Sequence, residues 1–227
     1  MKRIFALSVI IGFVVSLASS QENVRSLNTV TAHRHTVKAG ELILVASTVD
    51  HKRGSTLEDI LGDQLPVNSA VFVWNGTGYE TATRAAFFGW SENILVPRGK
   101  AFFVQVAASP PGDVTFALTG EVPEAHNGGG TTTVSVAGIS ATTYPYPAEI
   151  EFGATKSAQD APVNASVFFW NVSTQSYDAP TTKAVFSGWG DAETRVIEVG
   201  EGYFLDLTAS TPDNMSSDEV EPYDLSM

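Results

Sequence analysis

The sequence predicts an all-β fold of two homologous barrel- or sandwich-like units in tandem, related by pseudo-two-fold symmetry, with one short helix per unit. Three observations lead to this prediction. Of the 227 residues, 43% are hydrophobic and 17% are charged, as in a folded protein with a core. The apolar segments are short, rich in β-branched and aromatic residues, and bounded by turn formers, which is typical of strands. The second half of the chain also repeats the motifs of the first.

The repeat is clearest in an aliphatic-aromatic block that ends in Trp-Asn. Val71-Phe72-Val73-Trp74-Asn75 recurs as Val167-Phe168-Phe169-Trp170-Asn171, a shift of 96 residues. The shift reaches 101 where Gly99-Lys100-Ala101-Phe102-Phe103 recurs as Gly200-Glu201-Gly202-Tyr203-Phe204. Small insertions in surface turns explain this drift, because turns tolerate changes of length and strands do not.

Within the first unit, the pattern predicts five strands, a hairpin and one helix. The strands are expected at Leu42 to Thr48, Ala70 to Asn75, Tyr79 to Ala85, Ala101 to Ala107 and Val114 to Val122. The helix is expected after Ser55, because Glu58 stands at capping-box distance from it and Gly62 can end the helix. Thr155 to Asp160 is the weaker counterpart in the second unit.

The two units differ at their ends. Met215 to Glu219 reads as a poor strand, whereas Val24 to Val30 is a surplus strand candidate before the first unit. Because open sheet edges invite aggregation, we expect the surplus strand to pair with Tyr203 to Thr208 of the second unit.

The chain divides into five segments. Residues 1–20 have the order of a signal peptide: Lys2 and Arg3, an apolar run, and a small-residue cleavage site before Gln21. Residues 21–122 form the first β unit, 123–131 a Gly-rich linker, 132–215 the second β unit and 216–227 an acidic disordered tail. The protein is therefore expected to be secreted, to the periplasm or the extracellular space, and to have no membrane anchor after cleavage of the signal.

The formal net charge of −12 argues against nucleic acid as a partner, because such a surface repels phosphates. The partners that remain possible are a second copy of the chain, through self-association, or a polysaccharide.

The motifs of common catalytic sites are absent. There is no Cys, and no nucleophile-elbow, Walker or Gly-x-Gly-x-x-Gly motif, so we expect neither an enzyme nor a cofactor. His33 and His35 would share a strand face, but no third ligand is identifiable and no metal site is predicted.

The candidate ligand-binding residues are aromatic and occur as repeated pairs: Tyr79 with Tyr177, and Trp90 with Trp189. Exposed aromatic faces stack on sugar rings, and a duplicated pair would bind with avidity.

Two other groups of residues are less favoured as a site. Trp74 and Trp170 stand in runs that are apolar on both faces, so they are expected in the core. Carboxylates for glycoside hydrolysis would have to come from Asp50, Glu58, Asp59 and Asp63, whose counterparts in the second unit are largely not acidic.

The order of motifs resembles exported β-rich tandem-repeat proteins of environmental bacteria such as Verrucomicrobia and their relatives. The likeness covers most of residues 39–210 and rests on the Trp-Asn block, a Tyr, a Gly-Trp and a closing Gly-x-Gly-aromatic-Phe block, which Gly200 to Phe204 matches. In the first unit, Ala101 replaces the second Gly. The resemblance implies a fold but no activity, because that group has no agreed function. The leading prediction is thus a non-catalytic exported structural or surface-matrix protein; the alternatives are a carbohydrate-binding module and, third, a hydrolase.

Overall fold

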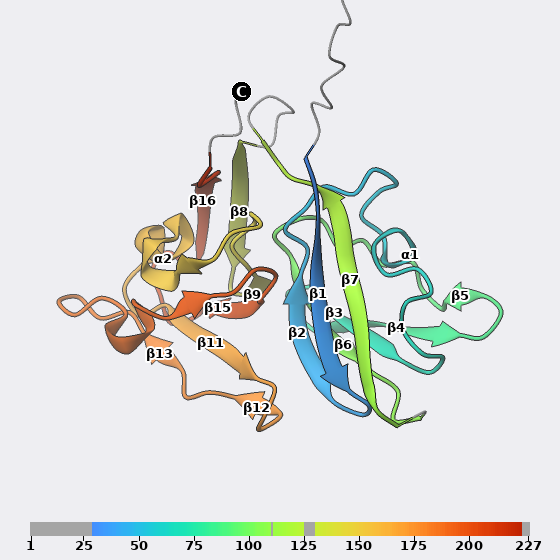
Figure 1. Cartoon of the computed structure of the whole chain (residues 1–227). Coiled ribbons are helices and arrows are strands. Elements are labelled where there is room, and N and C mark those ends of the chain that lie inside the picture. Colours follow the sequence, from blue (N-terminus) through green and yellow to red (C-terminus); the bar gives the residue numbers. More distant parts are fainter. Residues whose placement is uncertain (1–28, 110, 125–129, 224–227) are drawn as a thin grey trace, which may run out of the picture.

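The computed structural model describes residues 29–109, 111–124 and 130–223, and these form two halves that lie side by side (Figure 1). The expected signal peptide, residues 125–129 of the expected linker and residues 224–227 lie outside this description. The N-terminal half comprises β1 (Val30–Lys38), β2 (Leu42–Ala46), α1 (Leu57–Ile60), β3 (Ala70–Trp74), β4 (Tyr79–Ala85), β5 (Gly89–Trp90), β6 (Ala101–Gln105) and β7 (Asp113–Glu121).

The C-terminal half comprises β8 (Thr131–Ala137), β9 (Ile139–Thr142), β10 (Ile150–Glu151), the 3₁₀ turn η2 (Phe152–Ala154), α2 (Lys156–Asp160), β11 (Ser166–Asn171), β12 (Ser176–Tyr177), β13 (Thr181–Thr182), the 3₁₀ turn η3 (Gly190–Ala192), β14 (Val196–Ile197), β15 (Tyr203–Asp206) and β16 (Asn214–Val220). The described chain is therefore mainly β, as predicted, with one short α-helix in each half.

Each half combines a five-stranded sheet with a two-stranded ladder. The sheets have the orders β2-β6-β3-β4-β5 and β12-β11-β15-β9, with β13 beside β11, and the long ladders are β1·β7 and β8·β16; a short β10·β14 pair completes the C-terminal half. All these pairs are antiparallel. None of the described sheets closes on itself, so the barrel form of the prediction is not what the structure has.

A hydrophobic core fills the space between ladder and sheet in each half. In the N-terminal half, Phe116 and Leu118 of β7 pack with Val71 and Val73 of β3 and with α1. Because side chains alternate along a strand, the neighbours of these sheet residues face the opposite way. That second face carries Phe72 and other apolar residues, and it packs against the other half.

The short helices begin at Thr caps. Thr56 and Asp59 form the capping box of α1, one residue later than the predicted Ser55 and Glu58. The Thr155 hydroxyl accepts from Ala158 N at the start of α2, inside the predicted range. Both helices are therefore where the sequence placed them, although the residue that begins α1 differs.

The two chain ends differ from the prediction. The N-terminal strand is β1, and it pairs along its whole length with β7 of its own half, from Val30 opposite Glu121 to Lys38 opposite Asp113. The expected pairing of Val24 to Val30 with the second unit is thus wrong for Val30, and residues 24–28 lie outside the described part.

The partner of β8 is β16, so the prediction of a disordered tail over residues 216–227 is wrong for 216–220, which belong to this strand. Its inward residues include Ser217 and Glu219 rather than apolar ones, which is why it read as a poor strand. The Glu219 carboxylate is buried and accepts hydrogen bonds from Lys156 N, Ser157 N and Ser157 Oγ at 2.7–3.0 Å. A charged inward residue is tolerated here because donors at the start of α2 satisfy it.

Candidate functional site

The contact between the halves is built from aromatic side chains. Phe103 and Phe204 stack at a centroid distance of 6.2 Å, and Trp170 meets Phe103 edge-on at 5.0 Å. Trp74 contacts Phe204 at 6.3 Å in the same edge-on manner. This cluster consists of the second faces of the two main sheets, so the halves share an apolar interface in addition to their separate cores.

Trp74 and Trp170 belong to this interface rather than to either core, where they were expected. Both are half-buried. The indole of Trp74 donates to Ile139 O at 2.7 Å, and that of Trp170 donates to Leu42 O at 3.0 Å. Each tryptophan thus hydrogen-bonds to the backbone of the opposite half.

Tyr79 and Tyr177 are the exposed pair that the sequence predicted, with 45% and 39% of their surface accessible. Their rings cover the outer side of the interface: Tyr79 lies 5.1 Å from Trp74, and Tyr177 lies 5.2 Å from Trp170. Burial is the main cause that raises the pKa of Tyr177, and a hydrogen bond with the Tyr79 hydroxyl raises it further. The Tyr177 phenol therefore stays protonated at neutral pH, and its hydroxyl meets that of Tyr79 across the boundary between the halves.

Trp90 and Trp189, predicted as ligand contacts, are core residues. Only 7% and 2% of their surfaces are accessible, and their indoles donate to Gly62 O, just after α1, and to Ala158 O, within α2. Neither ring offers a face to a sugar. That part of the site prediction is wrong, because a Gly-Trp motif in sequence does not tell on which side of the hairpin the ring will lie.

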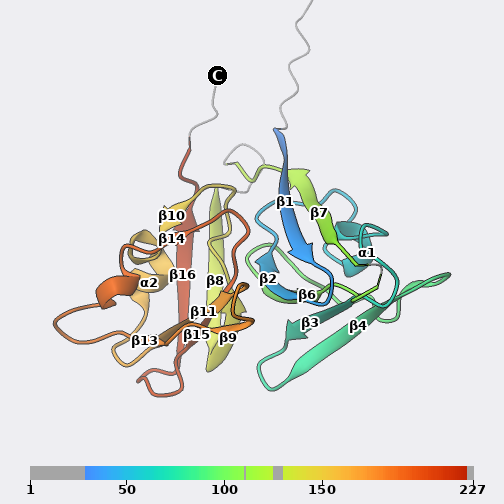
Figure 2. The same ribbon diagram turned by 60° about the horizontal axis from the view of Figure 1, so that its bottom comes forward.

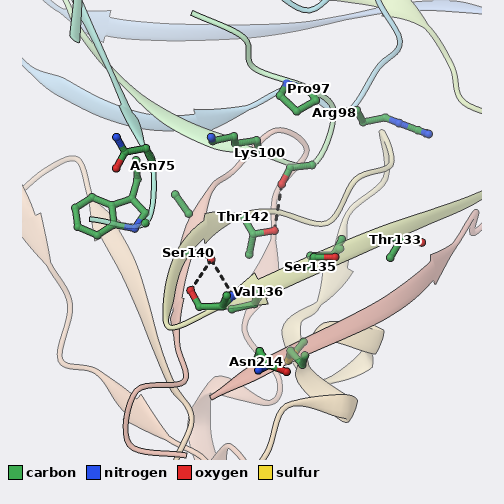
Figure 3. Close-up of a pocket in the computed structure, with 17 residues that line it drawn as sticks. Asn75, Pro97, Arg98, Lys100, Thr133, Ser135, Val136, Ser140, Thr142 and Asn214 are labelled. Atoms are coloured by element: carbon green, nitrogen blue, oxygen red, sulfur yellow. Dashed lines mark hydrogen bonds between the residues drawn. The ribbon is translucent and has the colours of Figure 1, made fainter. Parts of the chain in front are cut away.

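A cleft of about 540 Å³ opens at the boundary between the halves (Figure 3). One wall carries Asn75 and Lys100 of the N-terminal half beside the indole of Trp74, and the facing wall carries Ser135 of β8 and Ser140 of β9. The Thr142 hydroxyl on that wall donates to Gly99 O at 3.1 Å and ties the two walls together. Sequence reasoning missed this cleft, because its walls come from segments far apart in the chain.

A second, smaller cleft of about 380 Å³ lies along the same boundary. Its walls include His35 of β1, Trp170, and Arg195 with Glu201, which form a salt bridge. The hairpin loop between Trp170 and Tyr177 is two residues longer than that between Trp74 and Tyr79. Its Gln175 side chain accepts from Leu42 N and donates to Leu42 O, so the loop lies across the opposite half.

The histidines and carboxylates have structural surroundings. Burial lowers the pKa of His33, and burial together with His33 lowers that of His35 to about 4. In the described ranges, no three His, Asp or Glu side chains are placed to share a metal ion. Of the acids considered for hydrolysis, Asp50 pairs with Arg98 at 3.2 Å and Asp59 caps α1.

Comparison of the chain with protein-family models, with curated proteins and with solved structures gave no match. The similarity to exported tandem-repeat proteins therefore stays an untested expectation. No helix among the described residues is both long and apolar enough to cross a membrane.

Proposed function

We propose that this protein is a non-catalytic structural component exported to the periplasm or the extracellular space, built from two homologous units that pack about a pseudo-two-fold axis. The observation that carries the proposal is the use of the side chains that recur in both halves. Trp90 and Trp189 fill the cores, whereas Trp74 and Trp170 hold the interface. Repeated residues in packing positions indicate a repeated scaffold, because a repeated reaction would require repeated acids and bases.

Paired contacts support the proposed duplication. Ala46 N donates to Gly200 O at 2.9 Å, and Thr143 N donates to Gly99 O at 3.2 Å. Gly99 and Gly200 occupy equivalent positions of the sequence repeat. The two hydrogen bonds thus have the same form with the roles of the halves exchanged, as expected of units related by a two-fold axis.

Export and the lack of catalysis are tested together. The chain with a C-terminal tag is expressed in a Gram-negative host, the cells are fractionated, and the N-terminus of the product is sequenced. We expect Gln21 as the first residue, in the periplasm or medium, and no turnover of a panel of chromogenic glycosides. A cytoplasmic product that retains Met1 contradicts export, and turnover that disappears in Asp50→Asn contradicts the structural role.

Binding of a neutral saccharide in the larger cleft is the second candidate function. The cleft joins part of an indole surface to hydroxyl, amide and ammonium groups, which is the combination that sugars require. The negative net charge favours a neutral ligand over a polyanion. Tyr79 and Tyr177, the exposed pair, lie beside the same interface and remain candidate contacts.

A variant that fills the cleft tests this candidate. Ser135→Trp places an indole on the exposed side of β8, and Thr36→Trp is the matched control on the exposed side of β1. On a glycan array, neutral oligosaccharides should bind to the wild type and to the Thr36 variant but not to the Ser135 variant. If wild-type protein binds no neutral glycan, or if the Ser135 variant binds as well as wild type, the cleft is not a saccharide site.

A further inference from the structure

Two hairpin tips present aromatic side chains to solvent. The first tip, Ala86-Phe87-Phe88, joins β4 to β5, and the second tip, Val185-Phe186-Ser187, lies between the bridged residues Ala184 and Gly188. The accessible surface is 91% for Phe87, 89% for Phe88 and 100% for Phe186. Turn tips normally carry Gly, Asn, Asp, Pro or Ser, because these residues suit both the backbone and water. These phenylalanines therefore contribute almost nothing to the packing of the chain itself.

Both tips are held in place at their bases. Arg84 pairs with Trp90 and Ala85 with Gly89 below the first tip, and Ala184 bridges Gly188 below the second. Gly89 and Gly188 have φ values of +69° and +57°, which close short hairpin loops. The following tryptophan is buried in each case. The exposed rings are thus presented by an anchored hairpin, so little backbone entropy is lost when a partner covers them.

The tips point away from each other, at opposite ends of the molecule in both views (Figures 1 and 2). A flat surface can meet one tip but not both at once. The net charge of −12 opposes adsorption to anionic lipid and also the approach of two copies, so attraction between copies has to come from the apolar tips. Two apolar contacts of the same chemistry at opposite ends make the molecule bivalent, and contacts that do not close on themselves generate open chains.

We infer that the two tips join copies of this chain end to end, each tip packing against a tip of the next copy. A phenylalanine buries about 150–250 Å² in such a contact. A pair of tips therefore buries on the order of 600 Å² in total, below the roughly 1,200 Å² that a stable pairwise interface needs. Each contact is weak alone, and assembly depends on concentration. The inference rests on the proposed structural role, because it says how such a component would assemble. Its experiment measures self-association alone and does not depend on that role.

Sedimentation velocity of the purified protein from about 1 to 500 µM tests the inference. Wild-type protein should form species larger than a dimer as its concentration rises. A one-tip variant, Phe87→Ser with Phe88→Ser, should form nothing larger than a dimer. Removing both tips by adding Phe186→Ser should leave a monomer. Leu95→Ser, which removes an exposed apolar side chain outside the tips, is the matched control and should behave as wild type.

Three results would overturn the inference: wild type that stays monomeric throughout, a one-tip variant that assembles like wild type, or a monomer that uses its tips to bind phosphatidylcholine vesicles. Circular dichroism of each variant shows whether it is folded. These outcomes leave the proposed structural function intact, because that proposal is tested separately, by export and by turnover.

Discussion

Gly202 lies in a tight contact between the two halves, so a single methyl group there should weaken the protein. A Cβ built on Gly202 would stand 2.6 Å from the Cβ of Ala101 and 2.9 Å from Cγ of Leu44. Carbon atoms pack without strain at about 3.5–4.0 Å. Both neighbours are buried, Ala101 at 0% and Leu44 at 4% accessibility, so neither can move aside into solvent. The backbone of Gly202 is not in the left-handed region, and the objection to alanine is therefore steric alone.

Overpacking of this kind costs about 1–3 kcal/mol. For a chain of this size, about 2 kcal/mol corresponds to a fall in Tm of about 4–8 °C. We therefore expect Gly202→Ala to lower the urea midpoint, measured by tryptophan fluorescence, with little change in the slope. Ala101→Gly alone should cost about 1 kcal/mol, through a lost methyl group and a more flexible unfolded chain.

The double variant, Ala101→Gly with Gly202→Ala, moves the one methyl group from one half to the other. It should recover most of the stability lost by Gly202→Ala and cost less than about 1 kcal/mol, which against single costs of about 2 and 1 kcal/mol gives a coupling energy of about 2–3 kcal/mol in the double-mutant cycle. If the two costs simply add, or if Gly202→Ala alone is neutral, the contact between these residues is not as tight as described and the reasoning fails.

Three further perturbations test other parts of the structure. Trp189→Phe removes the indole that donates to Ala158 O and leaves a gap in the C-terminal core, so the free energy of unfolding should fall by about 2–3 kcal/mol in urea titrations. Glu219→Ala leaves buried amide donors such as Ser157 N without an acceptor and should cost about 2–3 kcal/mol; wild-type stability in this variant would show that β16 is not held by that carboxylate. His35 is neutral in the folded protein because burial lowers its pKa to about 4, whereas the unfolded chain takes up the proton near pH 6.5. Stability should therefore fall by up to about 3 kcal/mol between pH 7 and pH 4, and His35→Gln should flatten this pH dependence relative to the wild type.

The main-sheet strands of the N-terminal half could be read from the sequence because they obey simple alternation. In β3 and β6, alternate apolar residues face the core and the others face the second half, so these strands are apolar on both faces, except for Gln105 at the end of β6, and stand out between turns. The last strand, β16, does not show this alternation of apolar residues. β16 carries Glu219 inward, and its acceptability depends on amide donors of α2 that lie some 60 residues earlier in the chain. No local pattern contains that information.

The candidate site was harder to predict for the same physical reason. The spacing of aromatic residues identified which side chains recur, but exposure depends on the surface that the other half covers. Tyr79 and Tyr177 remain accessible at the edge of the interface, whereas Trp90 and Trp189 are buried and donate to backbone carbonyls after α1 and within α2. The exposed phenylalanines at the tips lie next to those same tryptophans in sequence. Within each hairpin, the most accessible aromatic residues therefore stand only two or three positions before a buried tryptophan.

The proposed duplication also accounts for the one glycine that the closing block of the first unit lacks. On a two-fold axis between identical subunits, a residue meets its own copy, so two alanines would clash and two glycines would leave a gap. A single chain is free of this restriction, since its two units can differ. Ala101 and Gly202 occupy equivalent positions and contact each other, which places them close to the proposed axis. The space between them admits one methyl group, which is that of Ala101. Packing therefore explains why the first unit has Ala where the second unit has Gly.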